Sequence, residues 1–331
     1  MRTNWWETLL GILFLVLCLI GGLALSEQTA PKPVIGVLRF AGVIDFDSAD
    51  YLINVLDVAR KDDSVAGVVM EILSPGGYST SSESIYYSML RLRDEKPLVV
   101  YVDGLAASGG YYMAVAGNRI YAPPSANLGN VGARSMQPED PVLFPDELST
   151  GPYKLSGGSR FDSIRQLELV RDSFLGNVVQ QRQNAAVNPL NIPPEEVGEA
   201  RLYLGSEAVA VGLADLAGGR SDAILGAAEL AGITDYDVVD LAEHEGVEPP
   251  QPIGVSFAAQ AAALAQQAPP ETVFLLDNRI PLAHSLSASQ VEAHLLSLRD
   301  ADMNPVSSAT QNQAAPPAFL KNILPAGDAL Q

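Results

Sequence analysis

Segments typical of β-strands alternate with segments typical of α-helices through the first third of the chain. Apolar runs rich in β-branched residues occupy 33–44, 65–73 and 97–105, and helical periodicity occupies 48–61 and 81–95. Strands that are apolar on both faces and separated by helices form parallel sheets that the helices cover. The sequence therefore predicts an α/β fold with a mostly parallel sheet and covering helices.

Shifts in composition divide the chain into six segments. The predicted α/β domain continues through a long amphipathic helix over 161–183 to a further set of helices and one final strand. An acidic, proline-containing stretch then opens an extension that contains a helix rich in Ala and Gln and a strand-like run at 273–276. The segments are a cytoplasmic N-terminus (1–8), an apolar stretch (9–25), a linker (26–33), the α/β domain (34–242), the extension (243–303) and a disordered tail (304–331).

The apolar stretch over 9–25 predicts a transmembrane helix. Its 17 uncharged residues would extend roughly 25 Å as a helix, close to the thickness of a hydrocarbon core. Trp5 and Trp6 precede it as an interfacial aromatic pair, and Arg2 favours a cytoplasmic N-terminus with the rest of the chain on the outer face. The alternative is a signal peptide cleaved after Ser26.

Charge and residue usage exclude several kinds of site. With 39 Asp+Glu against 20 Lys+Arg, the net charge is −19, which excludes nucleic-acid binding through a basic patch. Cys18 is the single cysteine, so no intrachain disulfide or cysteine-based zinc site can form. The three histidines, His244, His284 and His294, lie late in the chain, so the first 243 residues hold no histidine for a serine triad. We expect no metal and no cofactor.

Two glycine-rich turns follow successive predicted strands, at 74–77 and 107–110. Because the carboxyl ends of parallel strands meet at one edge of a sheet, both turns are expected to border one crevice. Ser108 can act there as a nucleophile, with the N–H of Gly109 and that of a glycine in the first turn holding the oxyanion. The alternative is that both are ordinary turns and that Ser108 caps a helix.

A serine nucleophile needs a base, and lysine is the available candidate. Four of the five lysines lie beside the apolar stretch, at charged helix ends or in the tail. Lys154 lies instead in an uncharged Gly/Ser-rich connection, and a lysine desolvated in an apolar cleft can lose its proton near neutral pH. A solvated surface charge is the alternative interpretation.

The ordered motifs SPGG at 74–77, AASGGYYMA at 106–114 and GPYKLSGGSRFDS at 151–163 resemble the signal peptide peptidase SppA family, peptidase family S49. The resemblance extends from about Val34 to Asp222 and makes 34–242 an S49-like serine peptidase domain of the ClpP/crotonase type. It implies that Ser108 is the nucleophile and Lys154 the general base. In this family the two residues meet across protomers or repeated halves, so a single copy of the domain implies a homo-oligomeric ring.

The resemblance also implies roles for the neighbouring residues. Gly109 and the SPGG turn correspond to the oxyanion hole, with Gly77 preferred to Gly76 as the second donor. Where the family has Thr-Gly-Ser-Ile-Gly after the nucleophile, this chain has LGNVG at 128–132. Asn130 is therefore expected to orient Lys154 in place of the serine; alternatively, the difference marks a slower or inactive relative.

These observations predict a membrane-anchored serine endopeptidase with a Ser108–Lys154 dyad. Its expected substrates are apolar peptides, such as remnants of signal peptides, on the outer face of the cell membrane. A catalytically weak or inactive scaffold that binds peptides or membrane partners is the alternative. An acyl-CoA enzyme of the same fold is disfavoured by the expected outward location and by the absence of a basic patch for a nucleotide phosphate.

Overall fold

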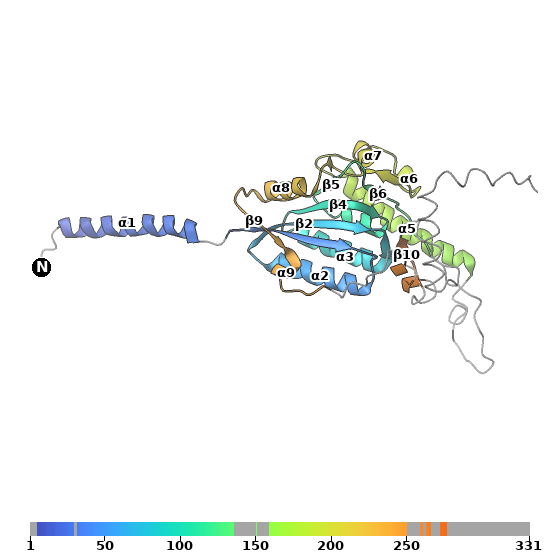
Figure 1. The fold of residues 1–331 in the computed structure, drawn as a ribbon, viewed down its shortest axis with the longest axis horizontal. Helices are drawn as coiled ribbons and strands as arrows, with labels where there is room; N and C mark the ends of the chain where they lie inside the picture. The colour runs from blue at the N-terminus through green and yellow to red at the C-terminus, as the bar shows by residue number, and fades with distance from the viewer. Residues whose placement is uncertain are drawn as a thin grey trace, which may run out of the picture. The chain divides into compact units, whose positions relative to one another are not determined.

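The computed structural model describes residues 5–29, 32–135, 150, 159–249, 259–260, 263–265 and 272–276 (Figure 1). The helices are α1 (Trp5–Thr29), α2 (Phe46–Lys61), α3 (Ser79–Arg93), α4 (Gly109–Ala114), α5 (Arg160–Gln183), α6 (Pro194–Val197), α7 (Gly205–Ala210), α8 (Arg220–Ala231) and α9 (Leu241–His244). The strands are β1 (Val34–Ala41), β2 (Val65–Ser74), β3 (Gly76–Tyr78), β4 (Leu98–Ala107), β5 (Arg119–Ala122), β6 (Asn127–Gly129), β7 (Leu202–Leu204), β8 (Leu216–Ala217), β9 (Asp237–Asp240) and β10 (Phe274–Leu276).

Eight of these strands form one sheet in the order β7-β6-β4-β2-β1-β9, with β5 joining β4 to β8. Every pair in it is parallel except β6 with β7. The three strands predicted over 33–44, 65–73 and 97–105 are β1, β2 and β4, and the helices predicted between them are α2 and α3. The predicted α/β class with a mostly parallel sheet is confirmed.

Strand β4 has two neighbours along the same edge. Its first half pairs with β5 from Val99 to Tyr101, and its second half pairs with β6, where Ala107 lies opposite Gly129. The edge therefore forks, and β6 continues beside β4 to the point where β4 ends. This fork places the 127–130 segment next to the turn that follows β4.

Helices cover both faces of the sheet (Figure 1). One apolar core includes the inward side chains of α2, α3 and α4, among them Leu52, Leu56 and Ile85, all fully buried. A second core on the opposite face joins Ile35, Val69 and neighbouring strand residues to α8. Burial on both faces explains why the long strands are apolar runs without alternation.

The segment over 193–242 contains more strands than the single one expected. The strands β7, β8 and β9 have three, two and four residues, which is too short for hydrophobic periodicity to show. Each is nevertheless held by the sheet, since β7 pairs with β6, β8 with β5 and β9 with β1. Tertiary pairing, rather than local sequence, creates these three strands.

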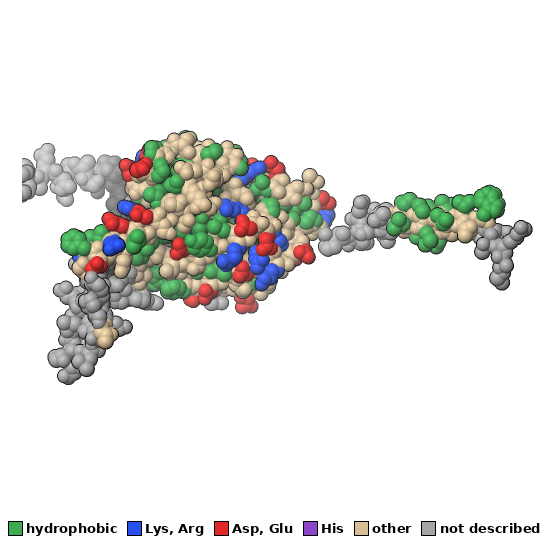
Figure 2. Space-filling view, turned by 180° about the vertical axis from the view of Figure 1, so that it is seen from behind, with side chains coloured by type: hydrophobic (Ala, Val, Ile, Leu, Met, Phe, Trp, Pro, Cys, Tyr) green, Lys and Arg blue, Asp and Glu red, His purple; other side chains and the backbone are tan. Residues whose placement is uncertain are grey.

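The predicted helix at the N-terminus is present as α1. Its described side chains, which lie between Trp5 and Ile20, are exposed and mostly hydrophobic, as Figure 2 shows. Among the residues that the structure describes, no helix is long and apolar enough to cross a membrane. The tail predicted over 304–331 lies outside the described residues.

Helix α5 confirms the long helix predicted over 161–183, but its burial is confined to its second half. Phe174, Val178 and Arg182 are its buried residues, whereas Phe161 and Leu169 are mostly exposed. The capping box between Ser159 and Asp162 defines its start, because each residue's side chain accepts a hydrogen bond from the other's backbone N–H. The apolar side chains of its first half are therefore left without a core.

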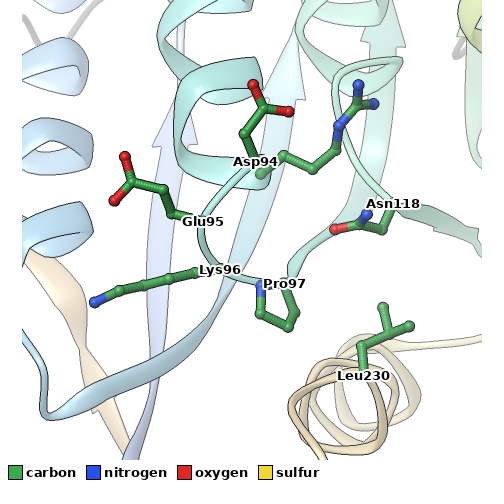
Figure 3. Close-up of a pocket in the computed structure, with 7 residues that line it drawn as sticks. Asp94, Glu95, Lys96, Pro97, Asn118 and Leu230 are labelled. Atoms are coloured by element: carbon green, nitrogen blue, oxygen red, sulfur yellow. The ribbon is translucent and has the colours of Figure 1, made fainter.

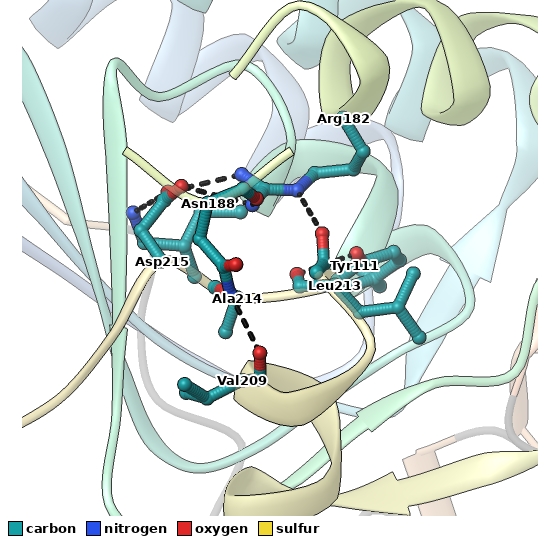
Figure 4. A network of polar contacts seen from close by, with 9 residues as sticks. Tyr111, Arg182, Asn188, Val209, Leu213, Ala214 and Asp215 are labelled. Carbon is teal, nitrogen blue, oxygen red and sulfur yellow. Dashed lines mark hydrogen bonds and ion pairs between the residues drawn. The ribbon is translucent and has the colours of Figure 1, made fainter. Parts of the chain in front are cut away.

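A buried ion pair fixes the second half of α5 to the sheet (Figure 4). The Arg182 guanidinium donates two hydrogen bonds of 2.9 Å to the two carboxylate oxygens of Asp215, and the side chains are 3% and 0% exposed. Arg182 also donates to the carbonyls of Gly212 and Asn188, and Asp215 accepts from the N–H of Ile120. Because the hydrogen-bonding groups of both partners are satisfied, the pair can persist away from water.

We predict that Asp215→Ala lowers the free energy of unfolding by about 3–5 kcal/mol, because it leaves the Arg182 charge buried without its partner. Urea unfolding followed by circular dichroism measures the change. The matched control is Arg171→Ala, since Arg171 forms an exposed pair with Asp172 and should cost less than about 1 kcal/mol. Equal losses in the two variants would contradict the assignment of a central role to the buried pair.

Candidate active site

Ser108 occupies a strained turn between the end of β4 and the start of α4. Its φ of 53° and ψ of −116° place a residue with a Cβ in a region that favours glycine. Such strain costs on the order of 1–3 kcal/mol and is concentrated at functional sites. A sharp strand-to-helix turn also presents the nucleophile in the serine elbow of α/β-hydrolases.

Ser108 is the N-cap residue of α4, and its carbonyl accepts from the N–H of Tyr112 at 2.9 Å. Its side chain, however, makes no capping hydrogen bond to the helix. The residue is fully buried, and its Oγ has no hydrogen-bond partner among the described residues. Its N–H donates to the carbonyl of Gly129 at 2.8 Å, which ties the turn to β6.

The two glycine-rich turns lie against each other, backbone to backbone. A Cβ placed on Gly76, whose φ is +97°, would lie 2.8 Å from the nitrogen of Gly109, closer than such contacts occur. A Cβ on Gly110 would lie 2.7 Å from the carbonyl oxygen of Ser74. Because these glycines have no side chain, the two turns can lie in contact at the carboxyl edge of the sheet, where the sequence predicts that both border one crevice.

The N–H of Gly77 is on the side of the first turn opposite Ile44, where β10 pairs with β3. Its neighbours bond to Ile44 on the other side, where Tyr78 N donates to Ile44 O and Gly76 O accepts from Ile44 N, both at 2.9 Å. Because successive N–H groups of an extended segment alternate in direction, the Gly77 N–H faces away from Ile44. The Gly76 N–H is already used, since it donates to Ser74 Oγ at 3.1 Å.

Asn130 lies beside Ser108 and is held by the segment before β7. Its backbone N–H donates to the carbonyl of Arg201 and its side-chain Nδ2 to the carbonyl of Ala200, both at 2.7 Å. Its φ of 57° is in the left-handed region that asparagine tolerates better than most residues. Lys154 lies outside the described residues, so the expected contact between Asn130 and Lys154 stays a prediction.

Two buried tyrosines fix α4 behind Ser108. Tyr111 donates from its hydroxyl to the carbonyl of Leu213 at 2.7 Å, next to the Arg182–Asp215 pair (Figure 4). The Tyr112 hydroxyl accepts from Asn177 Nδ2 at 2.6 Å. Burial raises the pKa of both phenols well above the usual value, so both stay neutral.

A cavity of about 280 Å³ adjoins Tyr112. It opens between the first turn of α3, the side of α4, the middle of α5 and one residue of β10. Hydroxyl groups and Glu83 line one part of it, and aromatic and aliphatic side chains line the rest. Its lining residues are Ser79, Thr80, Glu83, Tyr112, Leu169, Val170, Ser173, Phe174 and Leu275.

A second cavity, of about 210 Å³, lies at the opposite end of β4 from Ser108. Charged side chains of the α3–β4 turn line it, and Figure 3 shows Lys96 and Asp94 pointing in different directions. The Lys96 ammonium donates to the backbone carbonyls of Ala59 and Asp62. This cavity has no part in the geometry around Ser108.

One group of described side chains could offer ligands to a metal ion. Donor atoms of Asp62, His244 and Glu245 lie within 4.8 Å of one another, at the amino-terminal end of β2 and away from Ser108. Hydrogen bonds from the backbone and hydroxyl of Ser64 occupy both carboxylate oxygens of Asp62, and the backbone bond is the main reason that its pKa is lowered. The cluster therefore resembles an ordinary turn with its own hydrogen bonds.

The extension contributes Leu275 to the region around Ser108, a position that the sequence analysis did not predict. The run at 273–276 was predicted as a strand, and β10 confirms it. Its position was not predicted: β10 pairs with β3, where Leu275 lies opposite Gly77. Nothing in a three-residue apolar strand indicates its partner.

Comparisons with known proteins identify a peptidase family. A model of peptidase family S49 matches residues 91–139, which include Ser108 and Asn130. A protein of Methanocaldococcus jannaschii that is provisionally named a protease is 30% identical over 215 residues, which cover 60% of this chain and 68% of that protein. The chloroplastic serine protease SPPA of Arabidopsis thaliana is 29% identical over 187 residues, which cover 53% of this chain and 28% of the plant protein.

Among solved structures, a mutant of the 1510-N membrane-bound stomatin-specific protease aligns with 63% of this chain and 97% of its own. The sequence identity is 16% and the TM-score is 0.43. The family assignment rests instead on the sequence matches, of which the Methanocaldococcus protein is covered over two thirds of its length. The chain belongs to peptidase family S49, the SppA family.

Proposed function

We propose that this chain is a serine endopeptidase in which Ser108 is the nucleophile and Lys154 the general base. The observation that carries the proposal is the strained turn at Ser108, packed against a second glycine turn at the carboxyl edge of the sheet. Ser108 is fully buried and its side chain makes no capping hydrogen bond, and backbone strain of this kind is concentrated at functional sites. Lys154 is proposed as the base because it lies in the motif GPYK at 151–154, which resembles the motif of the family.

In the proposed reaction, Lys154 accepts the proton of Ser108 while Oγ attacks the carbonyl carbon of a peptide bond. The N–H groups of Gly109 and Gly77 donate to the oxyanion of the tetrahedral intermediate. Gly77 is preferred to Gly76 because the N–H of Gly76 already donates to Ser74. The protonated lysine then gives its proton to the leaving amine, and a water activated by the same lysine hydrolyses the acyl-enzyme.

We propose that the active form is a homo-oligomeric ring. In the resembled family the serine and the lysine meet across protomers or across repeated halves of one chain, and this chain has one copy of the domain. The first half of α5 supports the proposal, because Phe161, Ile164 and Leu169 are 82%, 41% and 62% exposed. Large apolar side chains grouped on one exposed helix are typical of a protein interface.

We propose that α1 attaches the chain to the cell membrane, with the catalytic domain on the outer face. The support is the uncharged run over 9–25 and the exposed Trp5 and Trp6 before it. Apolar peptides such as remnants of signal peptides are the proposed substrates. The partly apolar wall of the cavity beside Tyr112, which includes Leu169 and Phe174, suits such side chains.

We predict that Ser108→Ala and Lys154→Ala each lower kcat for an apolar fluorogenic peptide by about a thousandfold or more, because each removes one member of a dyad that acts as a unit. The control variants are Ser84→Ala and Lys61→Ala, which change exposed residues of the same types. Intact mass after a fluorophosphonate probe should show labelling of the wild type and none of Ser108→Ala. An assembled wild type that neither hydrolyses peptides nor takes the probe would favour the scaffold alternative.

We predict that Phe161→Asp dissociates the ring, because it places a charge in the proposed apolar interface, and that peptide hydrolysis falls with it. Sedimentation velocity across a concentration series measures the assembly. Leu225→Asp is the matched control, since Leu225 is 61% exposed on α8. A wild type that sediments as a monomer at every concentration would contradict the proposed ring.

We predict that the pair of changes Leu13→Asp and Phe14→Asp moves the full chain from the membrane fraction to the soluble fraction. Each carboxylate near the middle of a membrane helix costs about 2.5–3.5 kcal/mol, which is a large penalty for insertion. Fractionation after a carbonate wash measures the distribution, with Leu225→Asp as the control. Recovery of the wild type in the soluble fraction would count against the anchor.

A further inference from the structure

We propose that residues 272–276 of the extension occupy the peptide-binding groove of the active site in the position of a substrate, so that the chain blocks its own site. The proposal rests on the proposed peptidase function and adds its regulation and its substrate register. Leu275 takes the place of the substrate residue that precedes the cleaved bond.

The first observation is that the segment is bound between two backbone edges, as an extended peptide is. On one side β10 pairs antiparallel with β3 from Phe274 opposite Tyr78 to Leu276 opposite Gly76, beyond the end of β2 (Figure 1). On the other side the backbones of Phe274 and Arg134 exchange two hydrogen bonds, of 2.8 and 2.9 Å. Binding through main-chain pairing on exposed edges is a general mode of peptide recognition.

Hydrogen bonds on either side of this pairing also use main-chain atoms of the segment. The carbonyl of Val273 accepts from the N–H of Ser79 at 3.1 Å and from its hydroxyl at 2.9 Å. The carbonyl of Thr272 accepts from Ser135 Oγ at 3.1 Å. Main-chain contacts of this kind can be made equally well by another peptide, so a substrate can take the same place.

The second observation is the position of the Leu275 carbonyl. Leu275 lies opposite Gly77, whose N–H faces this side of the turn. The oxygen of Leu275 is so close to Gly76 that a Cβ on that glycine would lie 1.9 Å from it, and a Cβ on Gly109 would lie 3.1 Å from it. The carbonyl therefore lies between the two turns proposed to form the oxyanion hole, where the carbonyl of a substrate must lie.

The third observation is the direction of the side chains. Leu275 is 1% exposed, belongs to the main core cluster and lines the cavity beside Tyr112 and Phe174. Phe274 and Leu276 point to the other side, into a small cluster that includes Tyr78. The cavity thus receives one side chain from the strand, and an apolar residue of the size of leucine fits it.

The strand lies against the turn that carries the nucleophile. Ser108 has no exposed surface, and the Leu275 carbonyl lies close to its neighbour Gly109. A peptidase in this state cannot admit a substrate until 272–276 leaves. The pairing covers three residues, and so short a strand can be displaced as a unit.

The test uses the full chain and a fluorogenic peptide in which leucine precedes the cleaved bond. We expect Leu275→Asp and Leu275→Ala to raise kcat/KM about tenfold or more, because activity rises with the fraction of unblocked sites. Leu225→Asp on α8 is the matched control and should match the wild type. Equal kcat/KM in the wild type and both Leu275 variants, with Ser108→Ala inactive, would overturn the inference and leave the peptidase proposal intact.

A binding measurement separates occupancy from catalysis. A labelled peptide with the sequence of residues 272–276 should bind Ser108→Ala/Leu275→Asp at least about tenfold more tightly than Ser108→Ala alone, measured by fluorescence anisotropy, because only the double variant has a vacant groove. This result supports the inference even if no variant hydrolyses peptides, in which case the proposed catalysis alone is wrong. Equal affinity of the two proteins would overturn the inference. Thermal unfolding of each variant verifies that it is folded.

Discussion

The close contact between two backbones, at Gly76 and Gly109, is the constraint on which the site depends. Each turn follows a strand of the sheet, and the two strands are neighbours, so their separation is fixed by β pairing. A Cβ on Gly76 would meet the backbone nitrogen of Gly109, and a Cβ on Gly109 would meet the side chain of Ser82. A substitution at these positions therefore moves a turn, and with it the direction of the N–H groups that face the groove.

The strain at Ser108 is maintained by contacts on each side of it. Its N–H is bound to Gly129, and the helix that follows is fixed by the hydroxyls of Tyr111 and Tyr112. Leu213, the partner of Tyr111, lies next to Asp215 of the buried ion pair. The conformation of one serine is thus supported by a connected set of residues from α4, α5, β6 and the loop before β8.

The long elements and the neighbourhood of the two glycine turns could be predicted from the sequence, because hydrophobic periodicity and the parallel arrangement of strands determine them. The short strands could not, since two to four residues carry no period. The position of β10 could not either, because it depends on contacts such as Ser79 with Val273, 194 residues apart. For Asn130 the resemblance predicts a role in orienting Lys154, which stays a prediction, whereas its bonds to Ala200 and Arg201 follow from tertiary structure.

The fork in the sheet at β4 separates two tasks along a single strand. The first half, paired with β2 and β5, is enclosed in the core, and the second half leads with β6 to Ser108. Changes in packing at the first half act on the whole domain, whereas changes at the second half act on the local geometry of a few backbone groups. A substitution in the first half of this strand is therefore expected to act on the stability of the domain, and one in the second half on the position of Ser108.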